Sequence, residues 1–81
     1  MNEEEIRQIV KRALRRIAPE ADVDALPGNA DLRDAIDIDS MDVLNFFVGL
    51  HEQFNVDIAE RDYGRLRTID GCVGYIMEKA R

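Results

Sequence analysis

A serine among aspartates is the feature of this sequence best suited to chemistry. The segment Asp37-Ile38-Asp39-Ser40-Met41-Asp42 leads into the most apolar stretch of the chain, residues 43–50. Ser and Asp are favoured where a helix begins, because their side chains accept hydrogen bonds from backbone amides that lack partners there. The segment therefore predicts a helix that starts at Ser40 with an exposed hydroxyl, which serves either as a cap or as a modification site.

The residues that follow Ser40 form two apolar stripes at helical spacing. The first stripe is expected to face the core and comprises Val43, Phe46, Phe47, Leu50 and Phe54. The second stripe lies on another side and comprises Met41, Leu44 and Val48. A surface helix needs only one such stripe. The second indicates either a docking surface or a helix buried on two sides, and the spacing alone is compatible with both.

Residue counts argue against other kinds of site. His51 is the only histidine and Cys72 the only cysteine, so the sequence suggests neither a zinc cluster nor a Ser–His or Cys–His catalytic pair. We interpret Cys72 as a buried small apolar residue and His51 as a surface helix residue. The acids near Ser40 begin like an EF-hand loop, but Met41 occupies a ligand position and Asp42 the place of the required glycine. We therefore predict no catalytic residue and no metal site.

Charge is distributed unevenly along the chain. The net charge is −6, whereas residues 19–62 alone contain twelve acidic and two basic side chains. This acidic segment surrounds Ser40. Such a field repels nucleic acids and anionic membranes and attracts partners with basic patches. An acidic surface that only favours solubility is the alternative interpretation.

Length and hydropathy bound the class of protein. Eighty-one residues allow one domain with a small core, taken here as residues 1–81. The apolar runs are too short to span a bilayer, and the acidic residues 3–5 differ from the basic start of a signal peptide. We expect a soluble, cytoplasmic protein, and nothing in the sequence demands more than a monomer.

Helical periodicity predicts the first elements that position Ser40. A helix over residues 3–18 has acidic residues in its first turn, and Pro19 follows its end. A long connection over residues 19–39 comes next, with a short helical turn expected near residues 30–35. The helix that starts at Ser40 then follows.

The second half of the chain completes the bundle. Residues 60–66 read as a short helix, and a last helix runs to about Ala80 with Thr68 as its N-cap. Neither strand alternation nor internal repeats appear. The predicted fold is an all-α four-helix bundle, with three main helices, one short helix and a long loop between the first two.

A serine at the start of the second helix gives the chain a resemblance to the acyl carrier proteins. Asp39-Ser40-Met41 is similar to the Asp-Ser-Leu/Met motif of that family, in which the serine hydroxyl is esterified to phosphopantetheine. The resemblance runs without a gap from Asp39 to Ile76, and apolar residues occupy the positions of the family's core. These residues are Phe46, Phe47, Leu50, Phe54, Ile58, Leu66, Ile69, Val73 and Ile76.

The resemblance implies a carrier and not an enzyme. Ser40, preceded by Asp39, would be the attachment site, and a phosphopantetheinyl transferase would use coenzyme A and Mg²⁺ to modify it. The arm's thiol would carry acyl groups as thioesters between acyl-transferring, condensing or ligase enzymes of fatty-acid, polyketide or specialised lipid synthesis. The surface that meets basic patches on these enzymes would comprise Met41, Asp42, Leu44, Val48 and Glu52. An acyl pocket would be lined by Phe46, Ile58, Leu66 and Ile76, each of which is otherwise a plain core residue.

Several residues depart from the family's common pattern. Asp37 stands where a glycine is common, and Asn45 and His51 stand where carriers of fatty acid synthesis often have acids. Tyr63 and Gly64 make the third helix atypical. These departures fit a specialised carrier as well as a housekeeping one. Two alternatives stay open: a peptidyl or aminoacyl carrier, and an unmodified helical adaptor that binds a partner helix through the second stripe.

Overall fold

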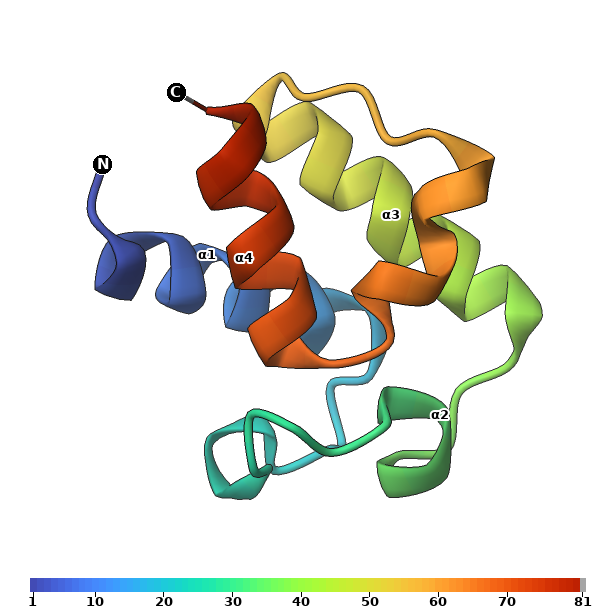
Figure 1. The fold of residues 1–81 in the computed structure, drawn as a ribbon. Helices are drawn as coiled ribbons and strands as arrows, with labels where there is room; N and C mark the ends of the chain where they lie inside the picture. The colour runs from blue at the N-terminus through green and yellow to red at the C-terminus, as the bar shows by residue number, and fades with distance from the viewer. Residues whose placement is uncertain (81) are drawn as a thin grey trace.

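The computed structural model describes residues 1–80, and the elements within them are helical (Figure 1). In chain order they are α1 (Glu3–Ile17), the 3₁₀ turn η1 (Val23–Ala25), α2 (Leu32–Ala35), α3 (Ser40–Phe54), the 3₁₀ helix η2 (Glu60–Leu66) and α4 (Ile69–Lys79). The predicted all-α bundle is confirmed. The short turn expected near residues 30–35 is α2, and the short third helix has 3₁₀ geometry.

The ends of α1 follow from local hydrogen bonds. The Asn2 side chain accepts a bond of 2.8 Å from the Glu5 amide, and the Glu5 carboxylate accepts one of 3.1 Å from the Asn2 amide. This reciprocal pair is a capping box. The Asn2 cap was not predicted, although Asn followed three residues later by Glu is a capping signal. The helix ends at Ile17, two residues before Pro19.

The end of α3 and the start of α4 are also determined by neighbouring residues. α3 stops after Phe54 because Asn55 adopts a left-handed conformation, with φ 52° and ψ 45°, which asparagine tolerates better than most residues. α4 begins where the Thr68 hydroxyl accepts a hydrogen bond of 2.9 Å from the Gly71 amide. The predicted N-cap is confirmed.

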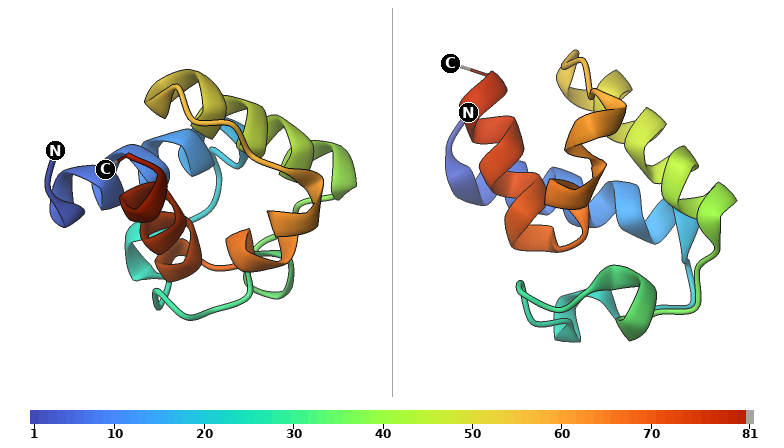
Figure 2. Two further views of the ribbon diagram at one scale, coloured as in Figure 1. Left: turned by 45° about the horizontal axis from the view of Figure 1, so that its top comes forward. Right: turned by 45° about the vertical axis from the view of Figure 1, so that its right-hand side comes forward.

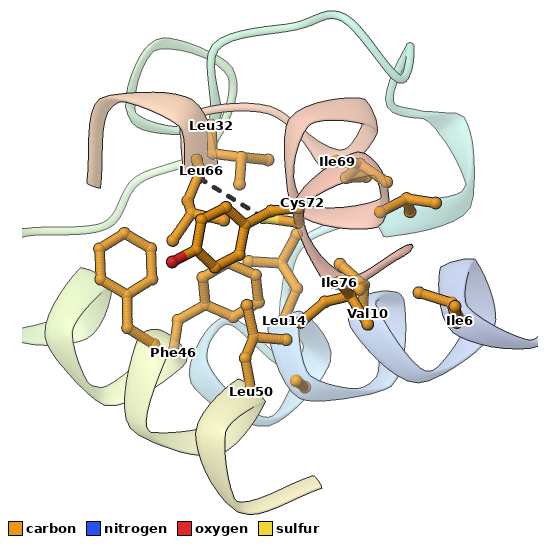
Figure 3. Packing of buried hydrophobic residues seen from close by; sticks show 14 of the residues in the cluster. Ile6, Val10, Leu14, Leu32, Phe46, Leu50, Leu66, Ile69, Cys72 and Ile76 are labelled. Carbon is orange, nitrogen blue, oxygen red and sulfur yellow. Dashed lines mark hydrogen bonds between the residues drawn. The ribbon is translucent and has the colours of Figure 1, made fainter. Parts of the chain in front are cut away.

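The core lies where α1 packs against both α3 and α4. Figure 3 shows the apolar side chains of the three helices meeting there. Completely buried members include Val10, Leu14, Leu50, Ile69 and Ile76. Burial of such side chains is the main favourable term in folding a chain of this size.

Tyr75 of α4 is also completely buried. Its burial was not predicted from the sequence. Within residues 1–80, every buried side-chain nitrogen or oxygen atom has a hydrogen-bond partner, and the Tyr75 phenol has one in Asp62. A paired phenol can be buried without the cost of a lost hydrogen bond.

The long connection between α1 and α3 folds along one side of the bundle (Figures 1 and 2). Val23 and Leu32 are buried and anchor it to the core. Two backbone hydrogen bonds of 2.9 Å, from the Leu32 amide to the Arg67 carbonyl and from the Asp70 amide to the Gly28 carbonyl, tie it to the start of α4. The connection is therefore held against the start of α4 as it leads to α3.

The three views also agree on where the ends of the chain lie. Residue 1 and the end of α4 are on one side of the bundle, and the start of α3 is on the opposite side (Figures 1 and 2). No helix within residues 1–80 is both long and apolar enough to cross a membrane.

Candidate functional site

Ser40 is the first residue of α3, and its side chain is exposed. The residues on either side of it supply the helix cap. The Asp39 carboxylate accepts a hydrogen bond of 2.9 Å from the Asp42 amide, and the Asp42 carboxylate accepts one of 3.2 Å from the Asp39 amide. Because these carboxylates form the capping box, the Ser40 hydroxyl is not needed to cap the helix.

A helix start of this kind suits a phosphate ester. The first amides of α3 carry partial positive charge, which favours a negatively charged group at this end of the helix. An exposed hydroxyl that the cap does not use is open to another enzyme's active site. The residues present therefore fit covalent attachment of phosphopantetheine through its phosphate.

The second stripe is exposed along α3. Met41, Leu44 and Val48 have 65%, 44% and 53% of their surface accessible, whereas Phe46 and Phe47 of the first stripe are buried. The alternative of a helix buried on two sides is therefore wrong. Large apolar side chains exposed in a row are typical of a surface that meets a partner.

The acidic residues predicted for the same surface lie at its edges. Glu52 is exposed one helical turn beyond Val48, while Asp42 is half-buried and committed to the capping box. Glu52 is thus free to face a partner. Asp42 caps the start of α3 and also contributes negative charge there.

A groove beside Ser40 runs between α3, η2 and the connection, with a volume of about 570 Å³. We call it the proximal groove. Its apolar lining comprises Leu32, Ile38, Val43, Leu44, Phe46, Phe47 and Leu66. Its other lining residues are Asp31, Arg33, Ser40, Tyr63, Gly64 and Arg67.

A second groove, here called the distal groove, has a volume of about 450 Å³. It is lined by Leu44, Phe47, Val48, His51, Asp57, Ile58 and Tyr63. Of the residues predicted for an acyl pocket, Phe46 and Leu66 line the proximal groove with Ser40, and Ile58 lines the distal groove. Ile76 is completely buried in the core (Figure 3).

Sequence reasoning missed several residues of the proximal groove. Leu32, Arg33 and Ile38 come from the long connection, whose path over the bundle has no periodic signal in the sequence. Tyr63 was noted only as unusual for its position. The pairing of a large aromatic residue, Tyr63, with a glycine, Gly64, was the available indication that the third helix lines a groove.

Cys72 and His51 occupy the environments predicted for them. Cys72 is completely buried, and its Sγ lies 3.5 Å from the Leu66 carbonyl oxygen (Figure 3). Burial raises the pKa of the Cys72 thiol to about 12, so a reactive thiolate is not formed at neutral pH. His51 is exposed, with Nδ1 2.9 Å from the Val56 carbonyl oxygen.

Potential metal ligands are dispersed over the surface. Within residues 1–80, no three His, Cys, Asp or Glu side chains are grouped so that they could hold a metal ion. Of the acids around Ser40, Asp39 and Asp42 are used to cap α3.

Comparison with known proteins agrees with this geometry. A family described as "phosphopantetheine attachment site" matches residues 4–76. The acyl carrier protein of Buchnera aphidicola is 26% identical over 77 residues, which cover 95% of this chain and 91% of that protein. The acyl carrier protein of Lactobacillus acidophilus is 29% identical over 76 residues, 94% of each chain. That of Kineococcus radiotolerans is 33% identical over 55 residues, 68% of each chain. This chain therefore belongs to the acyl carrier protein family, whose domains contain a phosphopantetheine attachment site.

Proposed function

We propose that Ser40 is the residue that holds the phosphopantetheine arm. The chain is an acyl carrier and not an enzyme, and phosphopantetheine is its prosthetic group. The observation that carries the assignment is the exposed hydroxyl at the start of α3, next to a cap made entirely by Asp39 and Asp42. Ser40 is also the only serine in the sequence.

The side chains around Ser40 have separate tasks in this proposal. Asp39 and Asp42 hold the first turn of α3, so that the hydroxyl projects from a fixed backbone position. The positive end of the helix stabilises the charge of the phosphodiester formed there. When bound, the arm supplies a thiol that holds acyl groups as thioesters.

Carriers of this family act with enzymes of acyl-transfer pathways. We propose that these partners, including the phosphopantetheinyl transferase, dock on the second stripe with Asp42 and Glu52 at its edges. The exposed apolar side chains provide close contact, and the acids attract basic patches on the partner and speed the encounter. The unmodified adaptor alternative would use the same stripe and would not need Ser40.

The proximal groove is the proposed shelter for the acyl chain. It opens beside Ser40 and is lined mainly by apolar side chains, among them Phe46 and Leu66. Burial of an acyl chain there removes its methylene groups from water. We also propose a cytoplasmic location, because the unpaired Cys72 thiol suits a reducing compartment.

Intact mass spectrometry tests the attachment site. The protein is incubated with coenzyme A, Mg²⁺ and a broad-specificity phosphopantetheinyl transferase. We expect the mass of the wild type to increase by one phosphopantetheine and the mass of Ser40→Ala to stay unchanged.

A matched control uses Thr68, the only threonine. Thr68→Ala removes the other aliphatic hydroxyl, which caps α4, and this variant should still gain the arm. A folded wild type that gains no mass would contradict the assignment and favour the adaptor.

A further inference from the structure

The proximal and distal grooves are separated by a wall of three side chains. Leu44, Phe47 and Tyr63 line both grooves. The ring centroids of Phe47 and Tyr63 lie 4.6 Å apart, with the ring planes tilted by 46°, an arrangement in which aromatic rings attract each other. The tilted pair thus joins α3 to η2 between the two grooves.

The two rings of this wall differ in how firmly they are held. Phe47 belongs to the buried stripe of α3 and has only 6% of its surface exposed, so its position is set by the core. Tyr63 is half-buried and stands on η2. A ring in this position can be replaced without opening the core.

The proximal groove, on the Ser40 side of the wall, is larger than the distal groove, with about 570 Å³ against about 450 Å³. Gly64 follows Tyr63 and lines the proximal groove without a side chain, and a Cβ built there would meet no other atom within 4 Å. The proximal groove therefore stays open until the Tyr63 ring. Beyond the ring lies the distal groove, which Ser40 does not line.

We propose that Tyr63 sets the length of acyl chain that this carrier can shelter, by closing the inner end of the proximal groove. The inference rests on the proposed attachment at Ser40. A chain that starts at the Ser40 side gains burial with each methylene until it meets the ring. Further methylenes stay in water and add nothing. The preferred cargo is a hydrocarbon acyl chain short enough to fit in the proximal groove.

A chain-length series tests this wall. The wild type and Tyr63→Ala are loaded by the transferase from acyl-coenzyme A donors of increasing length, from butyryl to palmitoyl. Mass spectrometry confirms loading, and the melting temperature is measured for each acyl form. In the wild type the melting temperature should rise with chain length and then reach a plateau. In Tyr63→Ala the rise should continue to longer chains.

Three further variants sharpen the result. Tyr63→Phe keeps the ring and should keep the wild-type plateau. Tyr63→Leu shortens the wall and should give an intermediate plateau, which keeps the test decisive if the alanine variant unfolds. Adding Ile58→Trp to Tyr63→Ala fills the distal groove with a larger side chain, and this double variant should return to the shorter plateau.

The experiment can disprove the role of Tyr63 and the attachment at Ser40 separately. If the wild type and Tyr63→Ala are both loaded and their melting temperatures reach a plateau at the same acyl chain length, the proposed role of Tyr63 is wrong. Ser40 would remain the attachment site. The same holds if the double variant keeps the longer plateau. A folded wild type that takes no acyl-phosphopantetheine in the mass spectrum would overturn the attachment site and this inference with it.

Discussion

The phenol of Tyr75 donates a hydrogen bond of 2.7 Å to Oδ2 of Asp62 and thereby joins α4 to η2. The Tyr75 ring is covered by the guanidinium of Arg65 and the amine of Lys79, 5.0 and 5.4 Å from its centroid. Arg65 also pairs with Glu78 of α4. Because η2 is fastened to α4 in this way, its other side is left to form the groove walls opposite α3.

Tyr75→Phe should loosen η2. The variant removes one hydrogen bond, and we expect it to lower the free energy of unfolding by about 1 kcal/mol. Urea denaturation measures this loss, and amide hydrogen exchange should become faster in residues 60–66. Asp62→Asn keeps an acceptor for the phenol and should cost less. Unchanged exchange in η2 would show that the bond does not hold it.

Two glycines of α4 should respond to alanine in opposite directions. A Cβ at Gly71 would overlap the backbone carbonyl oxygen of Arg65, whereas a Cβ at Gly74 would meet no atom within 4 Å. Gly71→Ala should therefore cost about 1–3 kcal/mol through overpacking. Gly74→Ala should stabilise the helix by about 0.5–1 kcal/mol. Thermal unfolding of both variants checks the pair, and equal shifts would contradict this account of the packing.

Asp39→Ala should weaken the start of α3. Loss of a side-chain cap costs about 1 kcal/mol, and the Ser40 hydroxyl is then held less firmly. We expect a lower melting temperature and slower loading by the transferase. Asp39→Asn keeps an acceptor for the Asp42 amide, so its melting temperature and its loading rate should fall less than those of Asp39→Ala. If alanine and asparagine slow loading equally, the charge of Asp39 matters more than its cap.

Alkaline pH should destabilise the fold through Cys72. Burial raises the pKa of its thiol from an ordinary value of 9.0 to about 12. Between these values the unfolded chain loses the proton and the folded chain keeps it, so the free energy of unfolding falls as pH rises. The fall attributable to one such group is at most about 1.4 kcal/mol per pH unit.

Urea denaturation between pH 9 and 12 measures how steeply the free energy of unfolding falls as pH rises. Burial and the bond to Asp62 also raise the pKa of Tyr75, and that shift acts in the same direction. Cys72→Ala should have a shallower slope than the wild type, whatever its absolute stability. Identical slopes would mean that the thiol does not contribute.

Leu44→Asp should impair docking without impairing folding. Leu44 is 44% exposed, so the substitution leaves most core contacts intact. Loss of an apolar contact at the centre of a docking surface commonly costs more than 1 kcal/mol, and we expect kcat/KM for transferase loading to fall about tenfold. Arg61→Asp is a matched control because this exposed residue of η2 lies outside the proposed surface. A normal kcat/KM for Leu44→Asp would argue against docking there.

Helical periodicity was enough to predict the main helices because each has one continuous buried stripe. Ile6, Val10 and Leu14 lie one turn apart in the sequence and meet the same core. The Thr68 cap was predictable for a similar reason, since a capping bond joins residues only three apart. The cap of α3 was predicted only approximately, because Ser40 was the candidate and the capping residue is its neighbour Asp39. Such features depend on neighbours along the chain.

The grooves could not be predicted in this way. Their width depends on the separation of α3 and η2, which is set by contacts distant in sequence such as the tilted contact between the Phe47 and Tyr63 rings. Ile76 illustrates the limit: the resemblance implied a place in an acyl pocket, with a plain core residue as the alternative, and Ile76 is completely buried and lines neither groove. Its spacing placed it on the inner face of α4, but a groove residue and a core residue have the same period.

The location of the chain ends has a practical consequence for studying this carrier. Residue 1 and the end of α4 lie on the side away from the start of α3 (Figure 2). A domain tethered to a bead or sensor chip through residue 1, or through a tag that follows α4, would present the start of α3 on the side away from the support. Binding of enzymes could then be followed on immobilised protein without the support blocking their approach.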